Sequence, residues 1–203
     1  MNDHFYEPRK GHGLAHNPFK AIVAPRPIGW ISSVDREGRR NLAPYSFFNA
    51  VNDAPPMLYF STNGARKDTL NNIEATGEFV VNFVGAVQAQ AMNATSASVV
   101  HGVDEFALAG LTPVPSVIVK PPRVGGAIAA MECKLAQILR LTDAGGVEID
   151  AWMTIGEVVG VHIDSACLKD GVFDTVAARP IARCGNRGDY TEVDRLFEMI
   201  RPA

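Results

Sequence analysis

An alternation of apolar and polar residues runs through residues 147–163 and limits the folds open to this chain. Eight of its nine odd-numbered positions are apolar, the exception being Glu157. Successive side chains of a strand point to opposite faces, so this period predicts long antiparallel strands with the odd positions on one buried face. We expect residues 131–141 to form the partner strand and residues 143–146 to make the turn.

Shorter strand patterns fill the first half of the chain. Residues 28–34, 41–48, 57–61 and 78–84 are rich in β-branched and aromatic side chains, and proline and glycine separate them. The polar turn at 35–38 joins the first two segments into a hairpin.

Two helical patterns interrupt these strands. Residues 68–75 suit a helix with Asp68 as its N-cap and Gly77 as its end, and residues 87–96 suit a second helix. There is no strand–helix–strand repetition, which favours an α+β, mainly β, barrel-like fold. No Gly-x-Gly-x-x-Gly motif follows a strand, so a nicotinamide nucleotide would not sit in a Rossmann crevice.

Length and composition are those of an ordinary globular domain. The chain has 203 residues, of which 47% are hydrophobic and 20% charged. We expect one domain over 1–203, with a core at about 20–190, an irregular N-terminal lead and a short C-terminal helix. The polar start lacks a signal-peptide core, and no apolar run approaches the ~20 residues of a membrane span, so we expect a cytoplasmic protein without a membrane partner.

Charge and cysteine spacing exclude two further classes of function. The net charge of -3 offers no broad attraction for a polyanion, so we expect no nucleic-acid partner. Cys133, Cys167 and Cys184 match neither a disulfide framework nor zinc-ligand spacing, and His12 and His16 lack a third ligand nearby. We expect no metal site.

The junction between the strand at 57–61 and the helix at 68–75 has the makings of an anion site. The first amides of a helix are unpaired and carry partial positive charge, and they attract phosphate. A phosphate monoester needs several converging donors and one or two cations. The side chains here that could supply them are Ser61, Asn63, Arg66, Lys67 and Thr69, with Asp68 among them. An ordinary helix start with surface charges is the alternative.

The hairpin at 28–48 carries a second cluster, which mixes small hydroxyl, amide and aromatic groups on neighbouring strands. Its members are Trp30, Ser32, Ser33, Ala43, Tyr45, Ser46 and Asn49. A flat heteroaromatic ring wants apolar walls with a few polar groups at its edge. A half-exposed strand pair, in which such residues are frequent, is the alternative.

His162 stands out among the five histidines. Its parity puts it on the face opposite Val159, Val161 and Ile163, so it faces either solvent or a ligand. An imidazole facing a ligand could orient it or donate a proton.

Ordered blocks along most of the chain resemble the flavin reductase-like, flavoredoxin-type proteins. The blocks are PRPIGWISS at 25–33, NLAPYSFFN at 41–49, KDT and NI within 67–73, GEFVVN at 77–82, EF and AGL within 105–111, EC at 132–133, GVHID at 160–164, and IAR at 181–183 with Gly185 and Tyr190. The resemblance covers residues 25–190, and so many ordered blocks together are specific.

This resemblance implies an FMN-binding split β-barrel, a Greek-key antiparallel barrel with inserted helices, which is usually a homodimer with flavin near the subunit interface. It implies that Ser32, Ser33 and Ser46 lie along the isoalloxazine ring. Ser61, Lys67, Asp68 and Thr69 would be the phosphate and ribityl side, and His162 would lie where the nicotinamide donor approaches.

The activity implied is an oxidoreductase that transfers hydride from NADH or NADPH to flavin. Two alternatives stay open at this point. One is a flavoredoxin-type carrier that binds FMN and takes electrons from a protein partner. The other is a non-redox protein that stores or senses flavin. A reductase could also pass its electrons to an acceptor protein.

Overall fold

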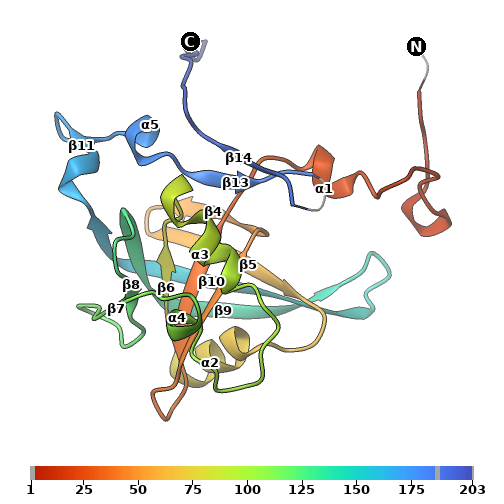
Figure 1. Ribbon diagram of the computed structural model, residues 1–203. Coiled ribbons are helices and arrows are strands. Elements are labelled where there is room, and N and C mark those ends of the chain that lie inside the picture. Colours follow the sequence, from red (N-terminus) through yellow and green to blue (C-terminus); the bar gives the residue numbers. More distant parts are fainter. Residues whose placement is uncertain (1–2, 186–187, 203) are drawn as a thin grey trace.

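A computed structural model describes residues 3–185 and 188–202, and an antiparallel seven-stranded sheet dominates it (Figure 1). The strands of this sheet are β2 (Gly29–Val34), β3 (Arg40–Tyr45), β4 (Phe48–Asp53), β5 (Pro56–Asn63), β6 (Glu78–Asn82), β9 (Ala129–Thr142) and β10 (Glu148–Ile163). Their order across the sheet is β3-β2-β6-β9-β10-β5-β4. The mainly β, antiparallel architecture expected from the sequence is confirmed.

Short strands and helices decorate this sheet. The short strands are β1 (Arg26–Pro27), β7 (Pro113–Val114), β8 (Arg123–Val124), β11 (Leu168–Lys169), β12 (Val172–Phe173), β13 (Ile181–Arg183) and β14 (Tyr190–Glu192). The α-helices are α1 (Phe19–Ile22), α2 (Asp68–Thr76), α3 (Ala89–Ala94), α4 (Glu105–Leu108) and α5 (Thr175–Ala178), and the 3-10 turns are η1 (Pro8–Lys10), η2 (Ala86–Gln88) and η3 (Ser165–Cys167). None of the helices in the described ranges is long and apolar enough to cross a bilayer.

The β9–β10 hairpin is the long antiparallel pair that the alternation predicts. In its turn, the Asp143 amide donates to the Val147 carbonyl and the Gly146 amide donates to the Asp143 carbonyl. The face assignment was wrong, however. Even-numbered Trp152 and Thr154 are buried. The register between β9 and β10 shifts at three places, between Glu148 and Trp152, between Ile155 and Gly156 and between Val158 and Gly160.

The last of these shifts, between Val158 and Gly160, changes which side chains of β10 point inward. Before it, Val158 packs on the barrel interior, and after it Val161 and Ile163 share a face with Met131 and line the open end of that interior. A single extra residue moves every later side chain to the other face. The even-numbered His162 consequently lies opposite Val161 and Ile163, as expected.

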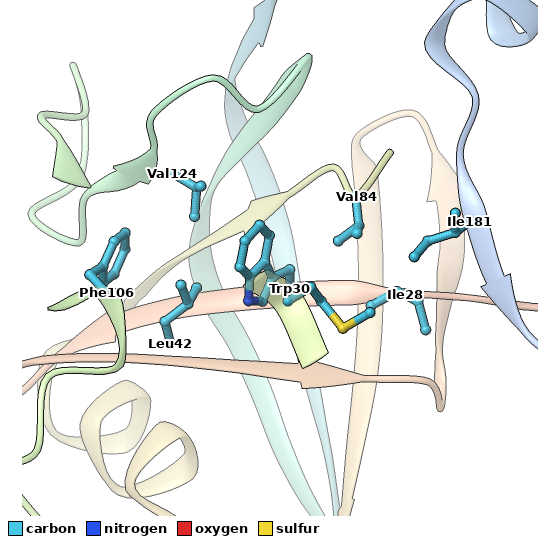
Figure 2. Close-up of a cluster of buried hydrophobic side chains, with 8 residues drawn as sticks. Ile28, Trp30, Leu42, Val84, Phe106, Val124 and Ile181 are labelled. Carbon is cyan, nitrogen blue, oxygen red and sulfur yellow. The ribbon is translucent and has the colours of Figure 1, made fainter. Parts of the chain in front are cut away.

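The two largest hydrophobic clusters cover the two faces of the sheet. The interior cluster consists of Ile31, Tyr45, Leu58, Phe60, Ile73, Phe79, Val81 and Cys133. The outer cluster lies under α3, α4 and the β7–β8 segment and surrounds Trp30, which is fully buried (Figure 2). Figure 2 shows the Trp30 indole between Leu42, Val124 and Val84. Removing so large a side chain from a packed core typically costs about 3–5 kcal/mol.

Helix α2 begins one residue differently from the sequence expectation. Lys67 is the N-cap and Asp68 is the first helical residue, while Gly77 ends the helix in the left-handed conformation at φ 74°. The second expected helix, at 87–96, is present as η2 followed by the six-residue α3.

The short C-terminal helix expected from the sequence is a further correction. After β14, the described residues 193–202 contain no helix, and they extend away from the body of the molecule (Figure 1). Leu196, Phe197, Met199 and Ile200 are 66–87% exposed. A segment this short gains too little from helix formation alone and needs a surface to pack on.

Candidate functional site

A cavity of about 440 Å³ opens at the N-terminal end of α2, and we call it the α2 cavity. Its lining comes from β3, the start of α2, the loop after α3 and the start of α4. The lining residues are Asn41, Ala43, Pro44, Tyr45, Arg66, Lys67, Asp68, Thr69, Thr95, Ser96, Ala97, Ser98, Val99, His101 and Glu105. Of the residues expected to bind a cofactor, Ala43, Lys67, Asp68 and Thr69 are brought together here.

The N-terminus of α2 is not capped by a side chain. Lys67 has extended backbone at the N-cap position, and no side chain accepts a hydrogen bond from the first turn. The first amides of a helix have no partner within the helix, so they remain available to a ligand. Lys67 is exposed and makes no ion pair with any residue in the described ranges.

Neutral polar groups form the inner wall of the cavity. The Asn41 side-chain amide donates to Thr69 Oγ1 at 2.8 Å and ties β3 to the first turn of α2. The Tyr45 hydroxyl is buried and has no hydrogen-bond partner in the described part of the chain. Burial raises the pKa of Tyr45 to about 12, and the nearby Thr69 hydroxyl only partly opposes this rise. A buried hydroxyl without a hydrogen-bond partner is rare.

Two carboxyl groups also line the cavity, and both have partners. Glu105 Oε2 accepts a hydrogen bond from the Leu42 amide at 2.9 Å, and burial raises the pKa of Glu105. Asp68 Oδ1 lies 2.9 Å from His101 Nδ1. The unpaired amides of α2 and the Lys67 ammonium are the groups at this cavity that remain available to an anionic ligand.

The loop after α3 supplies the wall that the sequence interpretation missed. Thr95, Ser96 and Ser98 add hydroxyl groups opposite Lys67–Thr69, and His101 closes one end through Asp68. The only sequence signal for this wall is its run of small hydroxyl residues, which has no period. Its position opposite α2 depends on the path of the chain.

The expected ring-binding residues of β2 lie beneath this cavity rather than on its surface. Trp30, Ser32 and Ser33 are fully buried. The Trp30 indole donates to Thr95 Oγ1 at 2.9 Å, and Ser32 Oγ donates to the Pro122 carbonyl. Ser33 Oγ accepts from Asn72 at 3.2 Å. Trp30 thus supports Thr95 of the cavity wall, and direct contact of these three side chains with a cofactor stays a prediction.

The remaining candidates lie on or beside β4 and β5, outside the α2 cavity. Ser46 is at the bend between β3 and β4, and the Ser61 amide donates to the Phe47 carbonyl at 2.8 Å. Asn49 and Asn63 are exposed. None of these four side chains lines the α2 cavity with Lys67.

His162 lines a separate cavity of about 510 Å³, together with Arg123, Asp164 and residues 126–128. Its Nε2 lies 2.5 Å from Oε1 of Glu132, which is fully buried on the same face of the sheet. His162 and the α2 cavity thus present two distinct polar sites on one subunit. No group of three or more His, Cys, Asp or Glu in the described ranges is arranged to hold a metal ion.

Comparison with known proteins identifies the family to which the chain is similar. Residues 23–178 match the model of the flavin reductase like domain. An uncharacterised protein of Aquifex aeolicus is 37% identical over 171 residues, covering 82% of this chain and 84% of the relative.

Two solved structures share the fold. Nitrilotriacetate monooxygenase component B from Bacillus cereus superposes with a TM-score of 0.83 at 32% identity, covering 92% of this chain and 98% of that one. Flavoredoxin of Desulfovibrio vulgaris gives a TM-score of 0.75 at 25% identity, covering 86% and 90%. The split-barrel expectation is thereby confirmed.

Proposed function

The chain belongs to the flavin reductase-like domain family, and on that premise we propose that it is an FMN-binding oxidoreductase that accepts hydride from NADH or NADPH. The observation that carries the proposal is the uncapped N-terminus of α2, with Lys67 unpaired beside it within the described residues, at the edge of the α2 cavity. Unpaired helix amides and one cation are the donor set that a phosphate monoester requires.

The rest of the cavity fits the polar chain between a phosphate and a ring. The unpartnered Tyr45 hydroxyl and the hydroxyls of Ser96 and Ser98 supply donors and acceptors for ribityl oxygens. Thr69, held by Asn41, keeps the first turn of α2 in place against β3. Bound flavin would supply the hydride-accepting ring, and the protein would supply position, electrostatics and exclusion of water.

We further propose that the protein is a homodimer. The open end of the barrel interior is an apolar groove of about 310 Å³, whose lining includes Phe48, Met131, Val161, Ile163 and Phe173. Val161 is 59% exposed and Ile163 is 43% exposed in the single chain. Apolar faces of this kind are typically covered by a partner subunit. Mass measured during size-exclusion chromatography would test this directly, and a single-chain mass would contradict it.

An absorption spectrum tests the central proposal. The full chain is incubated with FMN, freed of excess ligand and scanned, then mixed with NADH or NADPH without oxygen. We expect a flavin spectrum that bleaches on addition of one of these donors. Protein that stays colourless after incubation with FMN would contradict flavin binding, and a bound flavin that neither donor reduces would contradict the reductase assignment alone.

The likeness to flavoredoxin supports a second candidate, an FMN-binding electron carrier. The two candidates differ in turnover. Steady NAD(P)H oxidation with free flavin as acceptor would favour the reductase. A stable yellow protein that is reduced by a reduced protein donor, but not by either nicotinamide, would favour the carrier.

A further inference from the structure

Glu132 is the most completely hydrogen-bonded carboxylate described in this structure, and it has no exposed surface. Its Oε1 accepts from the Val117 amide at 2.8 Å and lies 2.5 Å from His162 Nε2. Its Oε2 accepts from the amides of Ile118 at 2.6 Å and Val119 at 2.9 Å. Four groups therefore converge on two oxygens, and three of them are backbone donors that cannot change role.

This environment keeps Glu132 ionised. Burial acts to raise its pKa, but the hydrogen bonds from Val117, His162, Ile118 and Val119 outweigh burial and hold the pKa at about 2. An ionised carboxylate only accepts hydrogen bonds. His162 must therefore carry a hydrogen on Nε2, whether the imidazole is neutral or protonated.

The other ring nitrogen is then the one whose role can vary. The His162 side chain is 24% exposed and lines a cavity with Arg123 and Asp164. Asp164 is already engaged, since its Oδ1 accepts from the Ala166 amide at 2.9 Å. Arg123 donates to the Pro115 carbonyl. In neutral His162 the Nδ1 atom is an acceptor, and a ligand with an N–H or O–H group would meet it there.

We propose that Glu132 is a positioning residue, which fixes His162 as the Nε2–H tautomer and so presents Nδ1 as the hydrogen-bonding atom toward a nicotinamide donor. The inference rests on the proposed function for the identity of that donor. The tautomer itself is a property of this chain and is independent of flavin. A carboxylate that holds the far nitrogen of a histidine is a recurrent way of fixing tautomer and ring orientation.

The substitution Glu132→Gln distinguishes a positioning role for Glu132 from a purely structural one, because only the positioning role predicts a change in the His162 tautomer. Glutamine has one acceptor and one NH₂ donor at its end. If the NH₂ faced Ile118 and Val119, it would meet two backbone donors that cannot become acceptors. If it faces Val117 and His162, it meets one backbone donor instead of two, and His162 can switch and accept through Nε2, which moves its hydrogen to Nδ1. We therefore expect the substitution to reverse the tautomer.

The measurement is the ¹⁵N–¹H correlation spectrum of the imidazole rings in the full-length protein without flavin, at a pH where His162 is neutral. In the native chain we expect a protonated-type nitrogen at Nε2 and an unprotonated-type nitrogen at Nδ1, and the reverse in Glu132→Gln. The imidazole signals that disappear from the spectrum of the His162→Gln variant are those of His162. His101, whose Nδ1 faces Asp68, is a control that should not change.

The possible results distinguish failure of the tautomer proposal from failure of the proposed function. A native His162 in the Nδ1–H form or in a tautomer mixture would overturn the proposal, and so would an unchanged tautomer in a folded Glu132→Gln protein. If that variant does not fold, the native spectrum alone decides. Flavin reduction at saturating NADH should fall about 10- to 100-fold in the folded variant, while FMN affinity stays within twofold. Loss of FMN binding in the native protein would contradict the proposed function and leave the tautomer result standing.

Discussion

Pro44 and His162 lie at the two ends of one cross-strand row in the sheet. Pro44 pairs with Trp30, Trp30 with Asn82, Asn82 with Ala130, and Ala130 with His162. The row spans four strand spacings, or up to about 19 Å. Pro44 lines the α2 cavity and His162 lines a different cavity, so for the proposed homodimer we predict that a flavin held by one subunit meets His162 of the second subunit.

Active-site complementation tests this separation. The assay uses an FMN concentration too low for the Lys67→Ala variant to bind FMN. Under this condition we expect Lys67→Ala chains alone and His162→Ala chains alone to reduce flavin poorly. After mixing and subunit exchange, half of the dimers are mixed, and one of their two sites contains both native residues. We expect about a quarter of the native rate in the mixture.

The matched control mixes Lys67→Ala with the double variant, which leaves every site defective. No recovery should occur there. If the rate of the first mixture is only the average of the two single variants, both residues act within one subunit, and the assignment of His162 across the interface is wrong.

Lys67→Ala should weaken FMN binding by about 10- to 100-fold, because it removes a charge-assisted contact with the phosphate. Riboflavin, which lacks the phosphate, should bind the native and variant chains alike. Flavin fluorescence titration measures both affinities. Lys169→Ala in β11 is the matched control, since Lys169 is exposed and outside the α2 cavity. Equal loss of riboflavin affinity would contradict a phosphate role.

Tyr45→Phe should separate stability from binding. The hydroxyl is buried without a partner in the described residues, so its removal should leave the free energy of unfolding unchanged or raise it by up to about 1 kcal/mol. FMN affinity should nevertheless fall by about 5- to 30-fold, since the ligand would lose a hydrogen bond. Urea unfolding and flavin titration give the two values, with Tyr59→Phe on β5 as control. A stability loss without an affinity loss would argue for a structural hydroxyl.

Acid should remove the stabilisation that Glu132 provides. Its pKa is about 2 in the folded chain against an ordinary 4.5, so its contribution is complete above pH 4.5 and disappears as the pH falls through 2. The linkage predicts a loss of about 2 kcal/mol between pH 6 and pH 3 from this group. Urea unfolding at both pH values measures it. Glu132→Gln should show a drop smaller by that amount, and an equal drop would place the acid sensitivity elsewhere.

His162→Gln and His162→Ala should differ in stability but not in reduction rate. Glutamine can keep an N–H donor toward Glu132, whereas alanine leaves a buried carboxylate with one partner fewer. We expect alanine to cost about 1–3 kcal/mol more in unfolding free energy. Both variants lack Nδ1, so both should slow anaerobic flavin reduction in stopped-flow measurements. Native reduction rates in His162→Gln would remove His162 from the proposed chemistry.

Local sequence was a good guide wherever neighbouring residues alone set the conformation. The hairpin of β9 and β10, the strand at Met57–Ser61 within β5 and the end of α2 at Gly77 follow from alternation, proline boundaries and the left-handed preference of glycine. The predicted start of α2 was wrong by one residue, and this difference changes which group caps the helix. Asp68 at the N-cap would have satisfied an amide that Lys67 leaves open.

The sequence by itself thus determined most of the long strands, though not β4, together with their antiparallel class and the segment that begins at Lys67, because these depend on residues close together in the chain. The family followed from blocks spread over residues 25–190. The tertiary structure decided which faces are buried, since the bulge after Val158 reverses the alternation. It also decided that Tyr45 shares a cavity with the loop after α3 and that Glu132 holds His162. These relationships join residues 30 or more positions apart, and only the packing of the sheet brings them together.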